Sequence, residues 1–62
     1  MLRISDVETY ININTEVVVL NWDGEEVVRC LGKDTQEAMK DIKDSIVSQF
    51  WVAKDKLVIE VY

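Results

Sequence analysis

The side chains best placed to do binding chemistry surround an Asp-Gly pair. Asp23, Glu25 and Glu26 put three carboxylates within four consecutive residues. Carboxylates can bind a cation or dock against a basic protein, but this spacing does not match a calcium loop, whose ligands recur over about 12 residues. Turn chemistry alone explains Asp23-Gly24, because glycine takes a positive φ at no steric cost and aspartate tolerates one. We therefore expect a solvated turn here, and keep the three carboxylates as candidates for contact with a partner.

Three aromatic side chains are the other binding candidates. They are Trp22, Trp51 and Tyr62. Tryptophan and tyrosine are enriched at interface hot spots, although a small domain also uses tryptophan to fill its core. The segment Glu16–Trp22 is apolar on both faces of an extended strand, while two short helices would cover only one face. Our hypothesis is that one face of the sheet, with Trp22 or Trp51 and with Tyr62, stays partly exposed and binds another protein chain.

Catalytic and metal-binding residues are hard to find in this chain. It has one cysteine, Cys30, and no histidine. A nucleophilic thiol needs a nearby base or a lowered pKa, and a structural zinc site needs four ligands, usually cysteine or histidine. No phosphate-binding loop, nucleotide fingerprint or catalytic serine motif is present. We expect Cys30 to be a small buried residue, and we expect a protein that is not an enzyme and uses no cofactor or metal.

The charge balance narrows the class of partner. Twelve acidic residues stand against seven basic ones, for a net charge of −5. Binding to nucleic acid phosphates requires clustered lysine and arginine, and an anionic membrane surface attracts the same residues. We therefore expect no direct nucleic acid partner and no membrane partner. An acidic chain is instead suited to a protein with a basic surface.

Location in the cell is suggested by the start of the chain and by its cysteine. Met1–Asp6 turns polar before an apolar run develops, so we expect no export signal. No uninterrupted apolar run is longer than that of Val17–Leu20, which is far too short to span a bilayer. A free cysteine is typical of reducing compartments. The prediction is a cytoplasmic protein.

A β-hairpin is the clearest element that would position these residues. Glu16–Trp22 and Glu25–Leu31 are rich in β-branched residues and flank Asp23-Gly24, which is the strongest short-range hairpin signal. The first strand is apolar on both faces, which is typical of a central strand. The second strand carries charged residues, which is typical of an edge.

Two capping patterns predict short helices. Ser5 to Glu8 matches a capping box, and the apolar spacing that follows predicts a helix from Asp6 to Ile11. The same logic at Asp34 to Glu37 predicts a second helix from Thr35 to Lys43.

The last third of the chain allows two interpretations. Ile46–Ala53 is rich in β-branched and aromatic residues and pairs naturally with Lys56–Tyr62 as a second hairpin. The alternative is one long helix from Thr35 to about Val52. The preferred prediction is a single α+β domain, residues 1–62, in which a small antiparallel sheet of three to four strands carries two short helices. Its order is α-β-β-α-β-β, and the alternative is β-β-α-β with a longer central helix.

Part of the chain resembles a group of short acidic proteins encoded by phages and prophages of Gram-positive bacteria. The resemblance rests on two stretches, at the start and the end of the chain. The first comprises Leu2, Ile4, Asp6, Val7, Tyr10, Ile11, Asn14, Thr15, Val17 and Val19, and the second is Lys54–Val61. It implies expression in an infected or lysogenic bacterial cell, and a host-directed binder such as an inhibitor of a defence nuclease or DNA-processing enzyme.

Two functions follow as hypotheses. The first is a small acidic protein-binding module that docks on a basic surface of another protein, since acidic inhibitors can match the charge of a nucleic-acid cleft. The second is a structural or self-assembling protein that forms a homodimer through a sheet edge or an apolar face.

Overall fold

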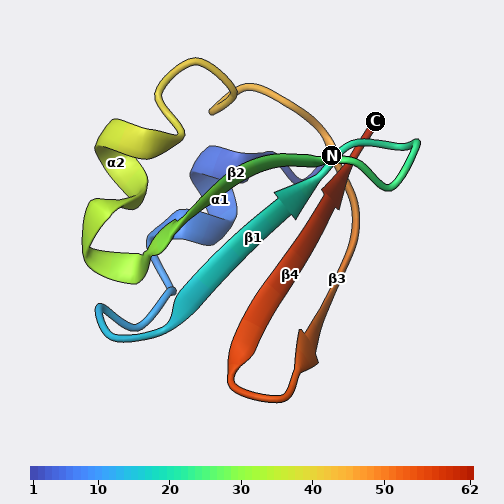
Figure 1. Ribbon diagram of the computed structural model, residues 1–62. Coiled ribbons are helices and arrows are strands. Elements are labelled where there is room, and N and C mark those ends of the chain that lie inside the picture. Colours follow the sequence, from blue (N-terminus) through green and yellow to red (C-terminus); the bar gives the residue numbers. More distant parts are fainter.

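The computed structural model describes residues 1–62 and has the order helix, hairpin, helix, hairpin (Figure 1). This confirms the α+β class and the α-β-β-α-β-β order, and the alternative with one long central helix is wrong. The elements are α1 Ile4–Glu8, β1 Glu16–Leu20, β2 Glu26–Leu31, α2 Thr35–Ala38, β3 Val47–Ala53 and β4 Lys56–Val61, with a 3₁₀ turn at Gly32–Asp34 before α2.

The sheet is mixed, with strand order β2-β1-β4-β3. Each hairpin is antiparallel, but the two central strands, β1 and β4, are parallel. The expectation of a wholly antiparallel sheet was therefore wrong for this one pairing. The reason lies in the connection from β2 to β3, because residues 32–46 carry the chain from one end of the sheet to the other. Such a crossover makes β3 run in the same direction as β2, and so β4 runs with β1.

The first hairpin is confirmed, with a longer loop than the Asp-Gly pair suggests. β1 ends at Leu20 and β2 begins at Glu26, so Trp22 lies in the loop rather than in the strand. Asn21 organises this loop: its side-chain oxygen accepts from the amides of Asp23 and Glu25, at 2.9 and 3.0 Å. Gly24 has a φ of +84°, as the turn chemistry requires.

Both predicted helices have different ends from those expected. α1 begins at Ile4, and the Arg3 amide donates to the Asp6 carboxylate at 2.9 Å in place of the Ser5–Glu8 capping box. α2 ends at Ala38 rather than Lys43. The carbonyls beyond it serve α1 instead, since Lys43 accepts from the Ser5 amide at 3.0 Å. First-turn amides have no partner within their own helix, and here the segment after α2 supplies carbonyl acceptors for the amides of Ile4 and Ser5.

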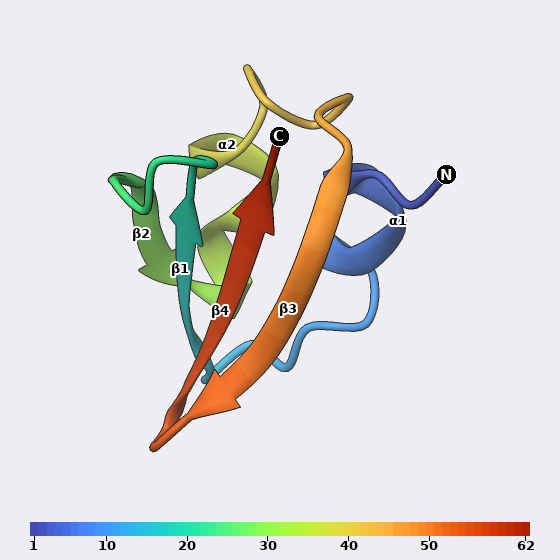
Figure 2. The ribbon, with the colours of Figure 1, turned by 90° about the vertical axis from the view of Figure 1, so that its right-hand side faces the viewer.

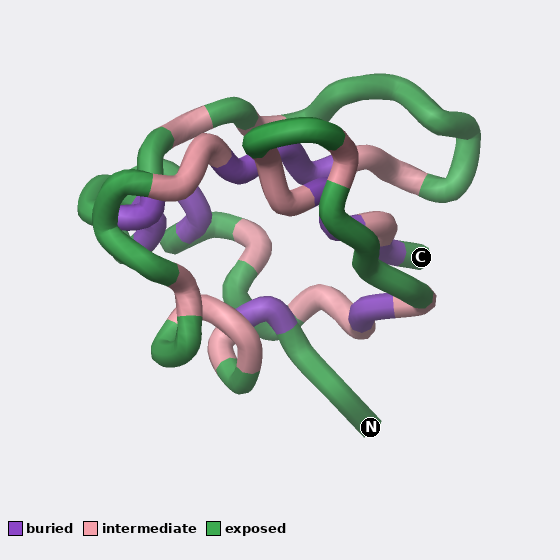
Figure 3. Tube along the Cα trace, turned by 90° about the horizontal axis from the view of Figure 1, so that it is seen from below, coloured by how far each residue is buried: buried purple, intermediate pink, exposed green.

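Both helices lie on the same side of the sheet (Figure 2). The core fills the space between, and its fully or nearly fully buried members are Ile4, Val17, Val19, Met39, Val47, Ile59 and Val61. Half-buried Val28 and Cys30 pack against this cluster. Figure 3 shows buried positions in short interrupted stretches and a long exposed stretch through the hairpin loop, from Trp22 to Val27. Neither helix has the length or apolar character to cross a membrane.

Candidate protein-binding surface

The other side of the sheet has no helix over it, and we call it the open face. Alternation along a strand sends every second side chain to this side, and the register aligns them in three rows across the four strands. From β2 to β3 these rows are Leu31, Glu16, Lys56 and Ala53; then Arg29, Val18, Val58 and Trp51; then Glu26, Leu20, Glu60 and Gln49. The open face thus combines charged, aliphatic and aromatic side chains.

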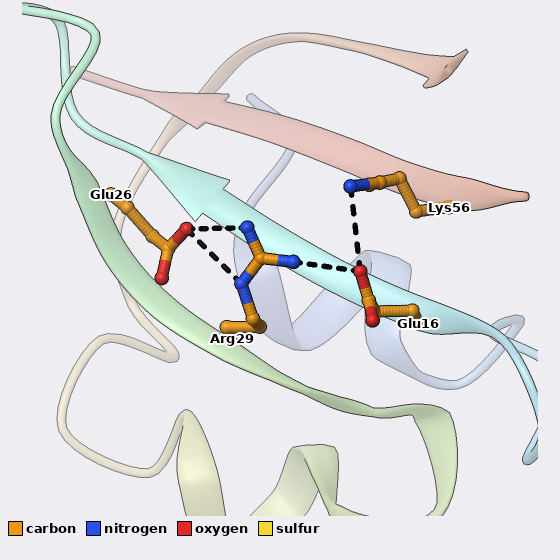
Figure 4. A network of polar contacts seen from close by, with 4 residues as sticks. All are labelled: Glu16, Glu26, Arg29 and Lys56. Carbon is orange, nitrogen blue, oxygen red and sulfur yellow. Dashed lines mark hydrogen bonds and ion pairs between the residues drawn. The ribbon is translucent and has the colours of Figure 1, made fainter. Parts of the chain in front are cut away.

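Four charged residues form a connected network on the open face (Figure 4). Arg29 bridges two carboxylates: its Nη1 lies 2.8 Å from Glu16 Oε1, and its Nη2 lies 2.8 Å from Glu26 Oε1. Lys56 Nζ approaches Glu16 Oε1 at 3.6 Å. The hydrogen bond from Arg29, together with its charge, lowers the pKa of the Glu26 carboxyl. These two acids and two bases neutralise one another, so the network contributes no net charge to the surface.

Val18 and Val58 are buried although no helix covers them. Only 5% and 7% of their surface is exposed. They lie in the middle row between Arg29 and Trp51, and long side chains can cover apolar neighbours with their stems while the charged heads stay in water. Trp51 itself remains 39% exposed. A shallow hollow of about 400 Å³ lies on this face, with Val18 and Val58 at its base and with Arg29, Lys56 and Trp51 among the residues that line it.

Glu60 differs from the other carboxylates on the open face because it has no cationic partner. Its Oε1 accepts from the Ser48 hydroxyl at 2.8 Å and from the Gln49 amide nitrogen at 3.1 Å. Asp23 and Glu25, in the hairpin loop, also form no ion pair. These three carboxylates therefore have no ion-pair partner within the chain.

The parallel pairing of β1 with β4 brings the hairpin loop and the residue after β4 to the same end of the sheet. Leu20 is level with Glu60, so Trp22 and Tyr62, each two residues further on, both extend beyond this end. They are 73% and 74% exposed. We call this region the acidic end; its members are Trp22, Asp23, Glu25, Glu60 and Tyr62.

The structure thus places the sequence-predicted residues in three environments. Trp22, Asp23 and Glu25 lie in the exposed loop, and Tyr62 joins them at the acidic end. Glu26 starts β2 and is engaged by Arg29. Trp51 lies halfway along β3, opposite Val58. Glu60 was missed as a candidate, and the signal for it is weak, because only the fold brings it level with the loop.

Cys30 faces the core, on the opposite side of β2 from Arg29. It is half-buried, and burial, with a further contribution from the charge of Asp34, raises the pKa of its thiol. A raised pKa keeps the thiol protonated and lowers its reactivity. No group of three or more histidine, cysteine, aspartate or glutamate side chains is placed to hold a metal ion.

A second surface, on the helix side, was not anticipated. An apolar groove of about 530 Å³ runs between α1 and β3, and we call it the α1–β3 groove. Its walls include Tyr10 and Ile11 just after α1 and the side chains of Phe50 and Val52 from β3. The sequence signal that could have revealed it is the absence of any charged residue from Ser45 to Ala53.

No protein-family model, curated protein or solved structure matches this chain.

Proposed function

We propose that this protein is a small acidic protein-binding module that docks its acidic end, together with the adjoining open face, on a basic surface of another protein. The observation that carries the proposal is that Trp22 and Tyr62, both largely exposed, lie at the same end of the sheet as three carboxylates that have no ion-pair partner. A basic partner suits both features, because lysine and arginine pair with carboxylates and also stack on aromatic faces.

The neutral network on the open face supports a contact in which the acidic end sets the orientation of the protein on its partner. Arg29 and Lys56 are already occupied by Glu16 and Glu26, so the strands beside the acidic end add little repulsion toward a basic surface. Electrostatic complementarity of this kind steers encounter and fixes orientation. Trp51 then offers an aromatic anchor further along the same face.

The resemblance to phage and prophage proteins extends the proposal to a class of partner. It favours a host protein of the bacterial cytoplasm, such as a defence nuclease or a DNA-processing enzyme, whose basic cleft the acidic end would occupy. Inhibition would then follow from competition with nucleic acid for the same cleft.

Affinity capture followed by titration tests the proposal. Tagged protein is incubated with lysate of a Gram-positive bacterium, the captured protein is identified and purified, and its affinity is measured at about 0.1 M and 1 M salt, where the Debye length is about 10 and 3 Å. We expect weaker binding at high salt. Trp22→Ala should weaken binding at least about tenfold, as expected when a hot-spot aromatic is truncated.

The control substitution is Ile13→Ala, at an exposed apolar residue away from the open face. It should leave the affinity unchanged. A purified partner that binds Trp22→Ala as tightly as the parent protein, or that binds equally well at both salt concentrations, would contradict the proposal.

A further inference from the structure

We infer that a second copy of this chain binds along β3, so that two sheets join into one continuous sheet through antiparallel pairing of β3 with its counterpart. This goes beyond the proposed function, since it concerns a different edge of the molecule and a different partner. The inference rests on four features of β3: its free backbone, its lack of charge, its exposed side chains and the symmetry of their order.

The backbone of β3 is only partly protected. It is an edge strand, with β4 on one side only. The segment Leu2–Ile4 covers its beginning: Arg3 forms a bridge with Ile46, and the Val47 amide donates to the Leu2 carbonyl at 2.8 Å. Beyond this point the outer edge of Gln49–Ala53 has no strand beside it, and alternate residues of an edge strand leave their amide and carbonyl groups unpaired.

The free part of β3 lacks the usual protection of an edge. Natural edges are defended by charged side chains, proline or bulges. The other edge strand, β2, carries Glu26 and Arg29, whereas no charged residue occurs between Ser45 and Ala53. The one irregularity of β3 lies between Val47 and Gln49, at the end already covered by Leu2–Ile4. The open stretch is thus regular and uncharged.

Exposed apolar side chains project from both sides of this stretch. Phe50 and Val52, 52% and 73% exposed, face the α1–β3 groove, and Trp51, 39% exposed, faces the other way. Leu2 and Tyr10, which precede and follow α1, line the same groove as Phe50 and Val52, and Figure 2 shows α1 beside and partly behind β3. These five side chains leave on the order of 500 Å² uncovered, so their complete burial in both copies would remove at most about 1,000 Å², near the lower limit for a specific interface.

The order of residues along β3 is complementary to itself. In antiparallel pairing about a two-fold axis through Trp51, Phe50 lies opposite Val52 of the second copy, and Val52 lies opposite its Phe50. Aromatic and β-branched residues form favourable cross-strand pairs, and both such pairs fall on the groove side. Trp51 meets its own counterpart on the open face, and Gln49 meets Ala53. A two-fold contact of this kind closes after two copies.

Sedimentation across micromolar to millimolar concentrations tests the inference. We expect a monomer–dimer equilibrium for the parent protein. Val52→Lys should remove the dimer, because it places a charge on the free edge, and far-UV circular dichroism should show that the fold is kept, since Val52 is already exposed. The matched control is Val27→Lys, at an exposed valine on the other edge strand, which should leave dimer formation intact.

Cross-linking tests the pairing register independently of Val52→Lys. In a Cys30→Ala background, Trp51→Cys places two thiols side by side at the two-fold axis, whereas Gln49→Cys separates them by about 13 Å, four residues along an extended strand. A short thiol cross-linker should join the first variant and not the second. A parent protein that stays monomeric throughout, a dimer that survives Val52→Lys, or equal cross-linking of the two cysteine variants would overturn the inference.

The dimer inference and the proposed function can be disproved independently, because different substitutions test them. A monomeric Val52→Lys protein should still bind a basic partner through the acidic end. Loss of the dimer with retained partner binding would therefore leave the proposed function standing. Loss of partner binding in Trp22→Ala with an intact dimer would leave the edge contact standing.

Discussion

Gly32→Ala is expected to leave most of the protein unfolded at room temperature. A Cβ atom at this position would overlap the carbonyl oxygen of Asn12 and would lie 2.8 Å from its carbonyl carbon. The obstacle is backbone, so it cannot rotate aside as a side chain would. The Gly32 amide also donates to the Thr15 carbonyl at 2.7 Å, and the Lys33 amide donates to the Ile13 carbonyl at 3.0 Å. The added methyl group would push the segment Gly32–Lys33 away from the segment Asn12–Thr15 and would break these two hydrogen bonds.

The magnitude follows from the size of the domain. A single core in a chain this short supplies about 3 to 5 kcal/mol of unfolding free energy, and the largest single-substitution losses reach about 4 to 5 kcal/mol, which is enough to unfold it. Urea denaturation followed by circular dichroism measures the loss. The control is Gly24→Ala, where no atom lies within 4 Å of the added Cβ and only the positive φ is penalised, at a cost of about 1 to 2 kcal/mol. Equal losses for the two variants would show that the Gly32 contact is wrongly described.

Met39→Ala should lower the free energy of unfolding by about 2 to 5 kcal/mol, because Met39 anchors the crossover connection in the core. Met39 is completely buried and follows directly after α2. α2 has only four residues, too few to be stable without packing. Met39, with Ile42 half-buried beside it, fastens this irregular segment to the sheet. Removing its side chain leaves a cavity and also frees the segment that hydrogen-bonds the start of α1.

Met39→Leu is the matched control, because it keeps nearly the same apolar volume and should cost less than about 1.5 kcal/mol. Thermal unfolding monitored by circular dichroism gives both values under the same conditions. A Met39→Ala protein as stable as the Met39→Leu protein would mean that the crossover connection is held in place by other contacts.

The parts of the fold that sequence reasoning predicted are those set by local chemistry. Asp23-Gly24 between two β-branched runs predicted the first hairpin, and the apolar character of both faces of β1 predicted its central place. The β-branched and aromatic residues of Ile46–Ala53 favoured a strand over a helix, and the structure agrees. Each of these signals lies within a few residues, where backbone propensity and side-chain alternation decide the outcome.

The parts that were missed depend on contacts between distant segments. After α2 the chain continues in tight turns, in which the amides of Ile42 and Ser45 donate to the carbonyls of Met39 and Ile42. This turn segment also supplies the Lys43 and Ser45 carbonyls that accept from the first amides of α1, a contact between segments about 40 residues apart that no local pattern predicts. The parallel pairing of β1 with β4 depends on where the crossover runs, which no local pattern records. A bulge between Val47 and Gln49 also places Val47 on the same side of the sheet as Phe50, whereas strict alternation would put the two on opposite sides.

The candidate surface also combines features set by local sequence with features set by contacts between distant segments. The exposed loop with Trp22, Asp23 and Glu25 follows from the turn signal. Its meeting with Glu60 and Tyr62 follows only from the parallel pairing. Asn21 carried a usable signal that was overlooked, because asparagine commonly accepts hydrogen bonds from amides a few residues further on and so organises turns.

Tryptophan accessibility tests most directly the claim that the open face and the acidic end stand free in water. Trp51→Phe leaves Trp22 as the only tryptophan, and Trp22→Phe leaves Trp51; each is measured by emission wavelength and acrylamide quenching in dilute, monomeric protein. The account predicts long-wavelength emission and strong quenching for Trp22, with intermediate values for Trp51. Short-wavelength emission and weak quenching from both tryptophans would contradict it.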